Sequence, residues 1–116
     1  MVKDWPKMAK DLSLAMREVR AGVPDVAKAF SELAKTATAT GALDPKAKEL
    51  IAVAIAVAVR CDGCIAFHVK AAFDLGATRE EIMETVGMSI YMGGGPSFIY
   101  GSQAVEAYDQ FAALKA

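Results

Sequence analysis

Apolar residues recur at intervals of three and four positions through the first third of the chain, which is the spacing of one face of an α-helix. In the first such segment the apolar positions are Met8, Leu12, Ala15, Met16 and Val19. Asp4-Trp5-Pro6 can start a helix there, and Gly22-Val23-Pro24 ends it. A second amphipathic segment opens at Pro24 and weakens toward Gly41. The pattern therefore predicts two successive helices.

Capping residues place the next two helices. Asp44 followed by Pro45 is an N-cap with proline at the first helical position, so a third helix is expected from about Pro45 to Arg60. A fourth helix is expected from about Asp62 to Leu75. Gly76 follows it and can supply a left-handed C-terminal cap.

A capping box and a glycine-rich break define the last two helices. Thr78-Arg-Glu-Glu81 starts a fifth helix, and Gly93-Gly-Gly-Pro96 separates it from a sixth that runs to the C-terminus. No convincing strand pair is present in the sequence. The predicted fold class is all-α, with six helices in one compact domain over residues 1–116.

The segment from Leu50 to Val59 consists of ten apolar residues in succession, so this part of the third helix has no polar face. It is too short to span a bilayer, which takes about 20 residues. Alternating Ile, Val and Ala would also suit a β-strand, but the cap at Asp44-Pro45 and the helix formers from Lys46 to Leu50 favour a helix. A helix that is apolar all round must be covered all round, and one small domain seldom has enough chain to do so. We therefore predict a homo-oligomer.

Charge and composition restrict the classes of binding partner and the cellular compartment that we expect. The 116 residues carry 13 basic and 14 acidic side chains, a formal net charge of -1, with no basic run that would attract nucleic acid or anionic lipid. Neither a nucleic-acid partner nor a membrane is expected. Residues 1–7 lack the apolar core of a signal peptide, which favours a cytoplasmic protein. Thiols stay reduced in that compartment, so a CxxC motif there indicates catalysis or metal binding.

The only two cysteines and the only histidine of the chain lie within eight residues, from Cys61 to His68. On a helix, Cys61, Cys64 and His68 fall within an arc of about 60°. We expect the dithiol at the start of the fourth helix, where unpaired N–H groups and the helix dipole favour an anionic sulfur. Arg60 is a further candidate for stabilising that anion. A thioredoxin fold would need a βαβ pattern that is missing here, so the dithiol is expected on a helical scaffold.

With Glu49 included, these residues match a known pattern. Glu49, Cys61, Cys64 and His68 reproduce the E-x11-C-x2-C-x3-H signature, and the chain resembles the alkylhydroperoxidase D family within the all-helical carboxymuconolactone decarboxylase superfamily. The sequence that flanks this signature also resembles that of the family, over about residues 41–107. The resemblance implies a six-helix alkylhydroperoxidase D-like unit that assembles into a trimer or hexamer. It also implies a dithiol that reduces a hydroperoxide or a disulfide and is then reduced by a dithiol donor. We expect neither a cofactor nor a metal.

The resemblance also implies a role for each site residue. Cys64 would be the thiolate that attacks the peroxide, Cys61 would resolve the sulfenic acid, and His68 and Glu49 would form a proton relay. Cys64 and His68 lie at i and i+4, which is compatible with direct proton transfer. The distance from Glu49 depends on the turn between two helices and does not follow from the sequence. The helix dipole taken alone would favour Cys61 as the attacking sulfur, so that assignment stays open.

Alternatives to a dithiol oxidoreductase remain at this stage. Cys61, Cys64, His68 and Glu49 could supply four zinc ligands in a non-catalytic assembly module. A lactone decarboxylase, as the superfamily name suggests, would use acid–base chemistry without thiols. The reductant is also open, because a lipoyl group, a thioredoxin-like protein or a small thiol could each reduce a CxxC pair. Apolar surroundings, expected from Ile65-Ala-Phe67, suit an organic hydroperoxide.

Overall fold

The computed structural model describes residues 1–115, in which it contains six α-helices and no strand. The helices are α1 (Trp5–Gly22), α2 (Pro24–Thr38), α3 (Pro45–Ala58), α4 (Asp62–Asp74), α5 (Arg79–Gly93) and α6 (Gly95–Lys115). The predicted all-α class is confirmed, and α3 and α4 end within two residues of the predicted positions. In the described part of the chain, no helix is both long and apolar enough to cross a bilayer.

The predicted N-terminal caps are present. Asp4 accepts a hydrogen bond from the backbone N–H of Lys7 at 3.1 Å, and Asp44 accepts one from Ala47 at 2.7 Å. Thr78 and Glu81 form the capping box, because each side chain accepts a hydrogen bond from the other residue's backbone N–H. These bonds pair N–H groups that the first turn of a helix would otherwise leave without a partner.

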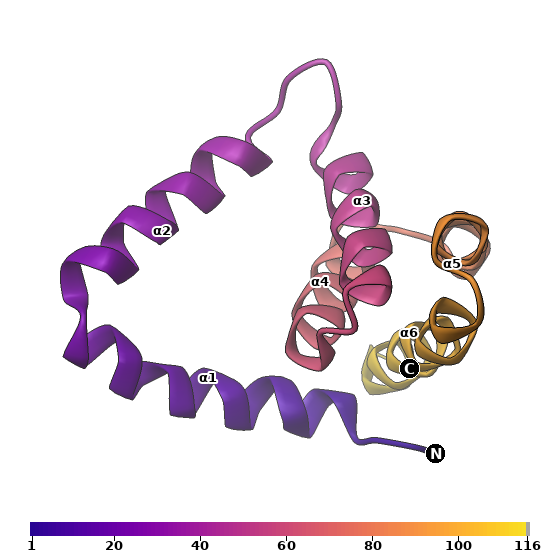
Figure 1. The fold of residues 1–116 in the computed structure, drawn as a ribbon, viewed down its shortest axis with the longest axis horizontal. Helices are drawn as coiled ribbons and strands as arrows, with labels where there is room; N and C mark the ends of the chain where they lie inside the picture. The colour runs from indigo at the N-terminus through magenta and orange to yellow at the C-terminus, as the bar shows by residue number, and fades with distance from the viewer. Residues whose placement is uncertain (116) are drawn as a thin grey trace.

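Helices α3 to α6 pack into the core of the molecule, and α1 lies against α4 and α6 (Figure 1). The core is made of fully or almost fully buried apolar side chains from these helices, among them Trp5, Val53, Val57, Ile65, Val69, Ile82, Ala104 and Phe111. Helix α6 approaches α5 closely at Gly101, where a Cβ atom would overlap the Val86 side chain. We call α1 and α2 together the arm (residues 5–38); α2, its outer half, contains no buried residue.

The turn between α3 and α4 places Cys61 directly at the start of α4. Arg60 has a left-handed backbone, with φ of 60°, and its N–H donates to Val57 at 3.2 Å. The N–H of Cys61 donates to the carbonyl of Ala56 at 3.1 Å, which completes a Schellman C-cap. Helix α3 therefore ends at Ala58 instead of the predicted Arg60, because the chain leaves the right-handed region at residue 60. A left-handed residue other than glycine costs about 1–2 kcal/mol.

Glu106 of α6 fastens the N-terminal segment to the core. Its carboxylate accepts hydrogen bonds from the backbone N–H groups of Val2 and Lys3, both at 2.8 Å, and from Nε1 of Trp5 at 3.0 Å. Burial acts to raise the pKa of Glu106, but these hydrogen bonds outweigh it and hold the pKa below its ordinary value. Because the pKa is lowered by folding, this contribution to stability is present near neutral pH and is lost as the pH falls through the folded-state pKa.

Candidate functional site

Cys61 and Cys64 are joined by a disulfide across the first turn of α4, with their Cα atoms 5.2 Å apart. Cys61 is the N-cap residue of α4, and its sulfur accepts a hydrogen bond from the backbone N–H of Cys64 at 3.2 Å. The pair therefore lies at the start of the fourth helix, as the sequence predicted. After reduction, this N–H group and the helix dipole would both favour a thiolate at the Cys61 position.

Glu49 and His68 form a close pair between α3 and α4. Oε2 of Glu49 lies 2.7 Å from Nδ1 of His68. Glu49 is buried, with 9% of its surface exposed, whereas His68 is partly exposed. The bond also orients the imidazole, because Nδ1 is engaged by Glu49 and Nε2 is left for proton exchange.

A small cavity of about 220 Å³ borders both Cys64 and His68, the partner of Glu49. It is lined by Ala52, Ile55 and Ala56 of α3, by Val59 at the C-cap of α3, and by Cys64 and His68 of α4. Cys64 therefore shares a cavity with His68, and His68 is bonded to Glu49. The structure places all four sequence-predicted site residues in one connected group.

The apolar wall of the cavity comes from α3, and the expectation that Ile65-Ala-Phe67 would provide it is wrong. Ile65 and Ala66 have no exposed surface, because they face the core. The wall residues recur at intervals of three and four along α3, which is one face of a helix. That signal is present in the sequence, but α3 is apolar on every face, so the pattern could not show which face borders the dithiol.

The residues present do not form a metal centre in this state. Within residues 1–115, no group of three or more His, Cys, Asp and Glu side chains is arranged to hold a metal ion. A zinc site built on Cys61 and Cys64 would need both sulfurs as separate thiolates, whereas here they are bonded to each other.

Comparisons with known proteins agree with this architecture. Residues 24–107 match the model of the carboxymuconolactone decarboxylase family. An uncharacterized protein of Cupriavidus necator is 44% identical over 86 residues, which cover 74% of this chain and 76% of that protein. Uncharacterized protein 4 in the cox locus of Paracoccus denitrificans is 38% identical over 98 residues, covering 84% of this chain and 88% of the relative.

Solved structures show the same fold. The chain superposes on the apo crystal structure of a carboxymuconolactone decarboxylase family protein from Legionella pneumophila with a TM-score of 0.89 and 48% identity, covering 92% of this chain and 96% of that one. A protein from Thermotoga maritima gives a TM-score of 0.80 at 28% identity, covering 91% and 96% of the two chains. With most of its length matched in both sequence and structure, the chain belongs to the carboxymuconolactone decarboxylase family.

Proposed function

We propose that the protein is a thiol-dependent oxidoreductase that uses Cys61 and Cys64 to reduce hydroperoxides or disulfides. The proposal rests on the arrangement of the four site residues, Cys61, Cys64, His68 and Glu49. Two sulfurs are close enough to form a disulfide at a helix start, and one of them shares a cavity with a histidine that is bonded to a buried carboxylate. A nucleophile next to a base that is itself oriented by a third group is the general arrangement of nucleophilic catalysis.

The proposed catalytic cycle has three steps. The Cys64 thiolate attacks one peroxide oxygen, the O–O bond breaks, and the departing alkoxide takes a proton to leave as an alcohol. Cys64 is then a sulfenic acid. The Cys61 thiolate attacks its sulfur, a disulfide forms, and water leaves after protonation. A dithiol donor reduces the disulfide and becomes a disulfide itself, so one hydroperoxide and one dithiol yield an alcohol, water and an oxidised donor.

Access to the cavity supports Cys64 as the attacking sulfur. Cys64 lines the apolar cavity with His68, and Cys61 is not among the lining residues. The hydrogen bond to Cys61 favours the opposite order, because the N-cap sulfur is the better stabilised anion. We propose that access to the cavity makes Cys64 the sulfur that reacts first with the peroxide. The stabilised Cys61 thiolate then attacks the sulfenic acid on Cys64.

The Glu49–His68 pair supplies the protons in this proposal. His68 would take the Cys64 proton before attack and return it to the leaving oxygen. The carboxylate of Glu49, held 2.7 Å from Nδ1, stabilises the imidazolium that forms between these events. Because Glu49 is buried, water screens its charge less than it screens that of an exposed carboxylate.

The test is consumption of tert-butyl hydroperoxide by metal-stripped protein with dihydrolipoamide or dithiothreitol as reductant. We expect catalytic turnover that disappears when the reduced protein is first alkylated with N-ethylmaleimide. Turnover that requires added zinc would support the metal alternative. Turnover of a lactone by the alkylated protein would support a decarboxylase. The proposal would be wrong if neither the hydroperoxide nor a model disulfide were reduced faster than in a protein-free control.

We further propose that the working form is a homo-oligomer, a trimer or a hexamer. The apolar helix α3 is covered on one side only: Val53 and Val57 are buried, whereas Ile51, Ile55 and Val59 are exposed, Ile55 by 56%. A second copy that covered this stripe would also close the site cavity, because Ile55 and Val59 line it.

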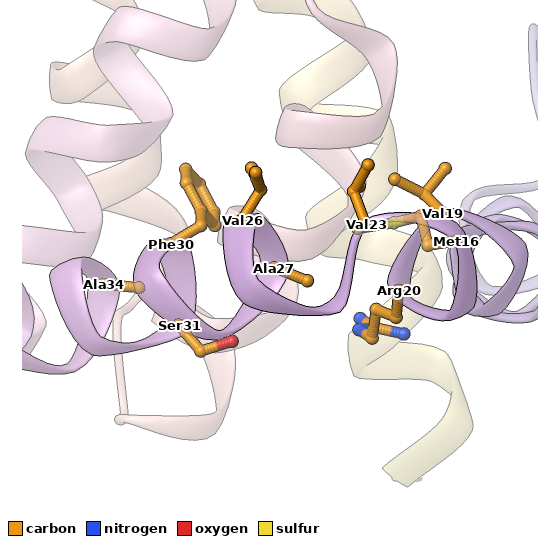
Figure 2. Close-up of a pocket in the computed structure, with 9 residues that line it drawn as sticks. All are labelled: Met16, Val19, Arg20, Val23, Val26, Ala27, Phe30, Ser31 and Ala34. Carbon is orange, nitrogen blue, oxygen red and sulfur yellow. The ribbon is translucent and has the colours of Figure 1, made fainter.

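The arm presents a second uncovered apolar surface. Figure 2 shows Val19, Val23, Val26 and Phe30 on the same side of the arm, around a hollow of about 390 Å³. Phe30 is 67% exposed, and Arg20 is the only charged residue that lines the hollow. Contiguous apolar surface of this kind marks an interaction site. A second copy of the chain carries the same two apolar surfaces, so the α3 stripe of one copy and the arm of the other are chemically suited to each other, which supports a second copy as the partner.

Phe30→Glu is therefore expected to weaken assembly by at least about 10-fold in dissociation constant, because a charge replaces an apolar anchor worth roughly 1.5–3 kcal/mol. Lys28→Glu is the matched control, since it lies about 200° around the same helix. Size-exclusion chromatography with light scattering, over a range of protein concentrations, measures both. A wild-type protein that is monomeric at all concentrations, or equal assembly of the two variants, would contradict the proposal.

A further inference from the structure

Lys3 reaches from the N-terminal segment to Asp62, the residue that follows Cys61. Its Nζ atom donates hydrogen bonds to Oδ2 of Asp62 at 2.6 Å and to Oε1 of Gln103 at 2.7 Å. It also lies 5.5 Å from the centre of the Trp5 ring and 5.8 Å from that of Tyr100. The ammonium thus lies between a carboxylate, an amide oxygen and two aromatic rings contributed by three parts of the chain. Asp62 lies inside the CxxC motif and directly follows Cys61.

The backbone of Lys3 is held in place separately from its side chain. Its N–H donates to Glu106, and its carbonyl accepts a hydrogen bond from Nε2 of Gln110 at 2.7 Å. Both partners are on α6, so the position of the ammonium over α4 is set by the α6 surface. An ordinary surface lysine has no such anchoring and loses side-chain entropy when it forms an ion pair.

Asp62 carries a negative charge one residue after Cys61, a sulfur that the proposed chemistry turns into a thiolate. It is the first residue of α4, and Cys61 before it is the N-cap residue. A carboxylate beside a thiol disfavours the thiolate, whereas a cation in the same place favours it. We propose that Lys3 is a positioning residue that neutralises Asp62 and thereby makes the Cys61–Cys64 disulfide easier to reduce. The inference rests on the proposed function, because it assumes that the dithiol cycles between its two redox states.

The physical link is the charge of the reduced form. Reduction adds two electrons to the disulfide, breaks the S–S bond and leaves two sulfurs that bind at most two protons. Any group that stabilises a thiolate in the reduced state shifts this equilibrium toward the dithiol and raises the reduction potential. The Lys3–Asp62 pair is partly exposed, at 29% and 36% of its side chains, so water and salt reduce the effect.

The experiment measures the equilibrium of the protein disulfide with buffers of graded ratios of reduced to oxidised dithiothreitol, read by alkylation and mass spectrometry. Lys3→Met removes the charge and keeps an apolar stem against the rings. We expect it to shift the equilibrium constant toward the disulfide by about three- to tenfold, or roughly 15–30 mV. Asp62→Asn should shift it by a similar factor toward the dithiol. The double variant Lys3→Met/Asp62→Asn should return close to the wild type.

Lys7→Met is the matched control, because Lys7 is paired with Asp11 on the surface of α1. It should leave the equilibrium unchanged. Shifts that shrink in 1 M salt would further support an electrostatic origin. The inference is overturned if Lys3→Met and Asp62→Asn shift the equilibrium in the same direction, as loosened packing would do, or if all variants stay within twofold of the wild type. If Lys3→Met fails to fold, Asp62→Asn alone still tests the sign.

The readout uses no peroxide, so it separates the two proposals. A wild-type protein without peroxidase or disulfide-reductase turnover, but with the opposite shifts of the single variants, would overturn the function and keep the role of Lys3. Turnover without the shifts would overturn the role of Lys3 alone.

Discussion

Cys64→Ser is expected to lower hydroperoxide turnover by about 10³-fold or more, because a serine hydroxyl is a far weaker nucleophile than a thiolate. Cys61→Ser should also stop turnover, but for a different reason. Its Cys64 can still be oxidised once, so one equivalent of hydroperoxide should be consumed and a sulfenic acid should accumulate. Single-turnover peroxide loss and trapping with dimedone, followed by mass spectrometry, distinguish the two variants.

The serine at position 61 also provides a control for folding. Cys61 is the N-cap of α4, and serine is a preferred N-cap residue, so α4 should keep its first turn in this variant. Unchanged circular dichroism and melting temperature would show that the loss of turnover is chemical. If Cys64→Ser retained the single equivalent and Cys61→Ser lost it, the two roles would be reversed and the N-cap sulfur would be the one that attacks.

Glu49→Gln is expected to lower turnover by about 10²- to 10³-fold, which lies within the usual range of about 10² to 10⁴ for general acid–base catalysis. The amide is close in shape to the carboxylate but carries no charge to stabilise an imidazolium at His68. His68→Asn should cause a loss of similar size. Because the two groups act as one unit, the double variant should be no slower than the slower single variant. Steady-state rates of the three variants measure this coupling.

Two further measurements test whether the loss of turnover comes from the proposed proton relay. Glu84→Gln, at an exposed position on α5, is the matched control and should keep wild-type rates. The alkylation rate of the reduced protein should fall in His68→Asn, since the imidazole no longer draws the proton from Cys64. Losses that multiply in the double variant would show that Glu49 and His68 act independently, and the relay would then be discarded.

Much of the fold was predictable because its signals are local. The caps at Asp4, Asp44 and Thr78 connect residues only three positions apart, so the sequence shows both partners of each hydrogen bond. Gly76 has a φ of 90°, as expected for a left-handed C-cap. The end of α3 was less predictable, because Arg60 takes the left-handed conformation that glycine would normally signal.

The sequence by itself determined the six helices and the spacing that puts Cys61 and Cys64 at the start of α4 and His68 one turn after Cys64. These follow from capping and from the period of one helix, which short-range interactions set. Only the tertiary structure decided that Glu49 is buried 2.7 Å from His68, that α3 supplies the apolar wall of the cavity, and that Lys3 reaches Asp62 across 59 positions of chain. These contacts depend on how helices pack against one another. An apolar helix such as α3 is compatible with several such packings, so its sequence alone does not select one.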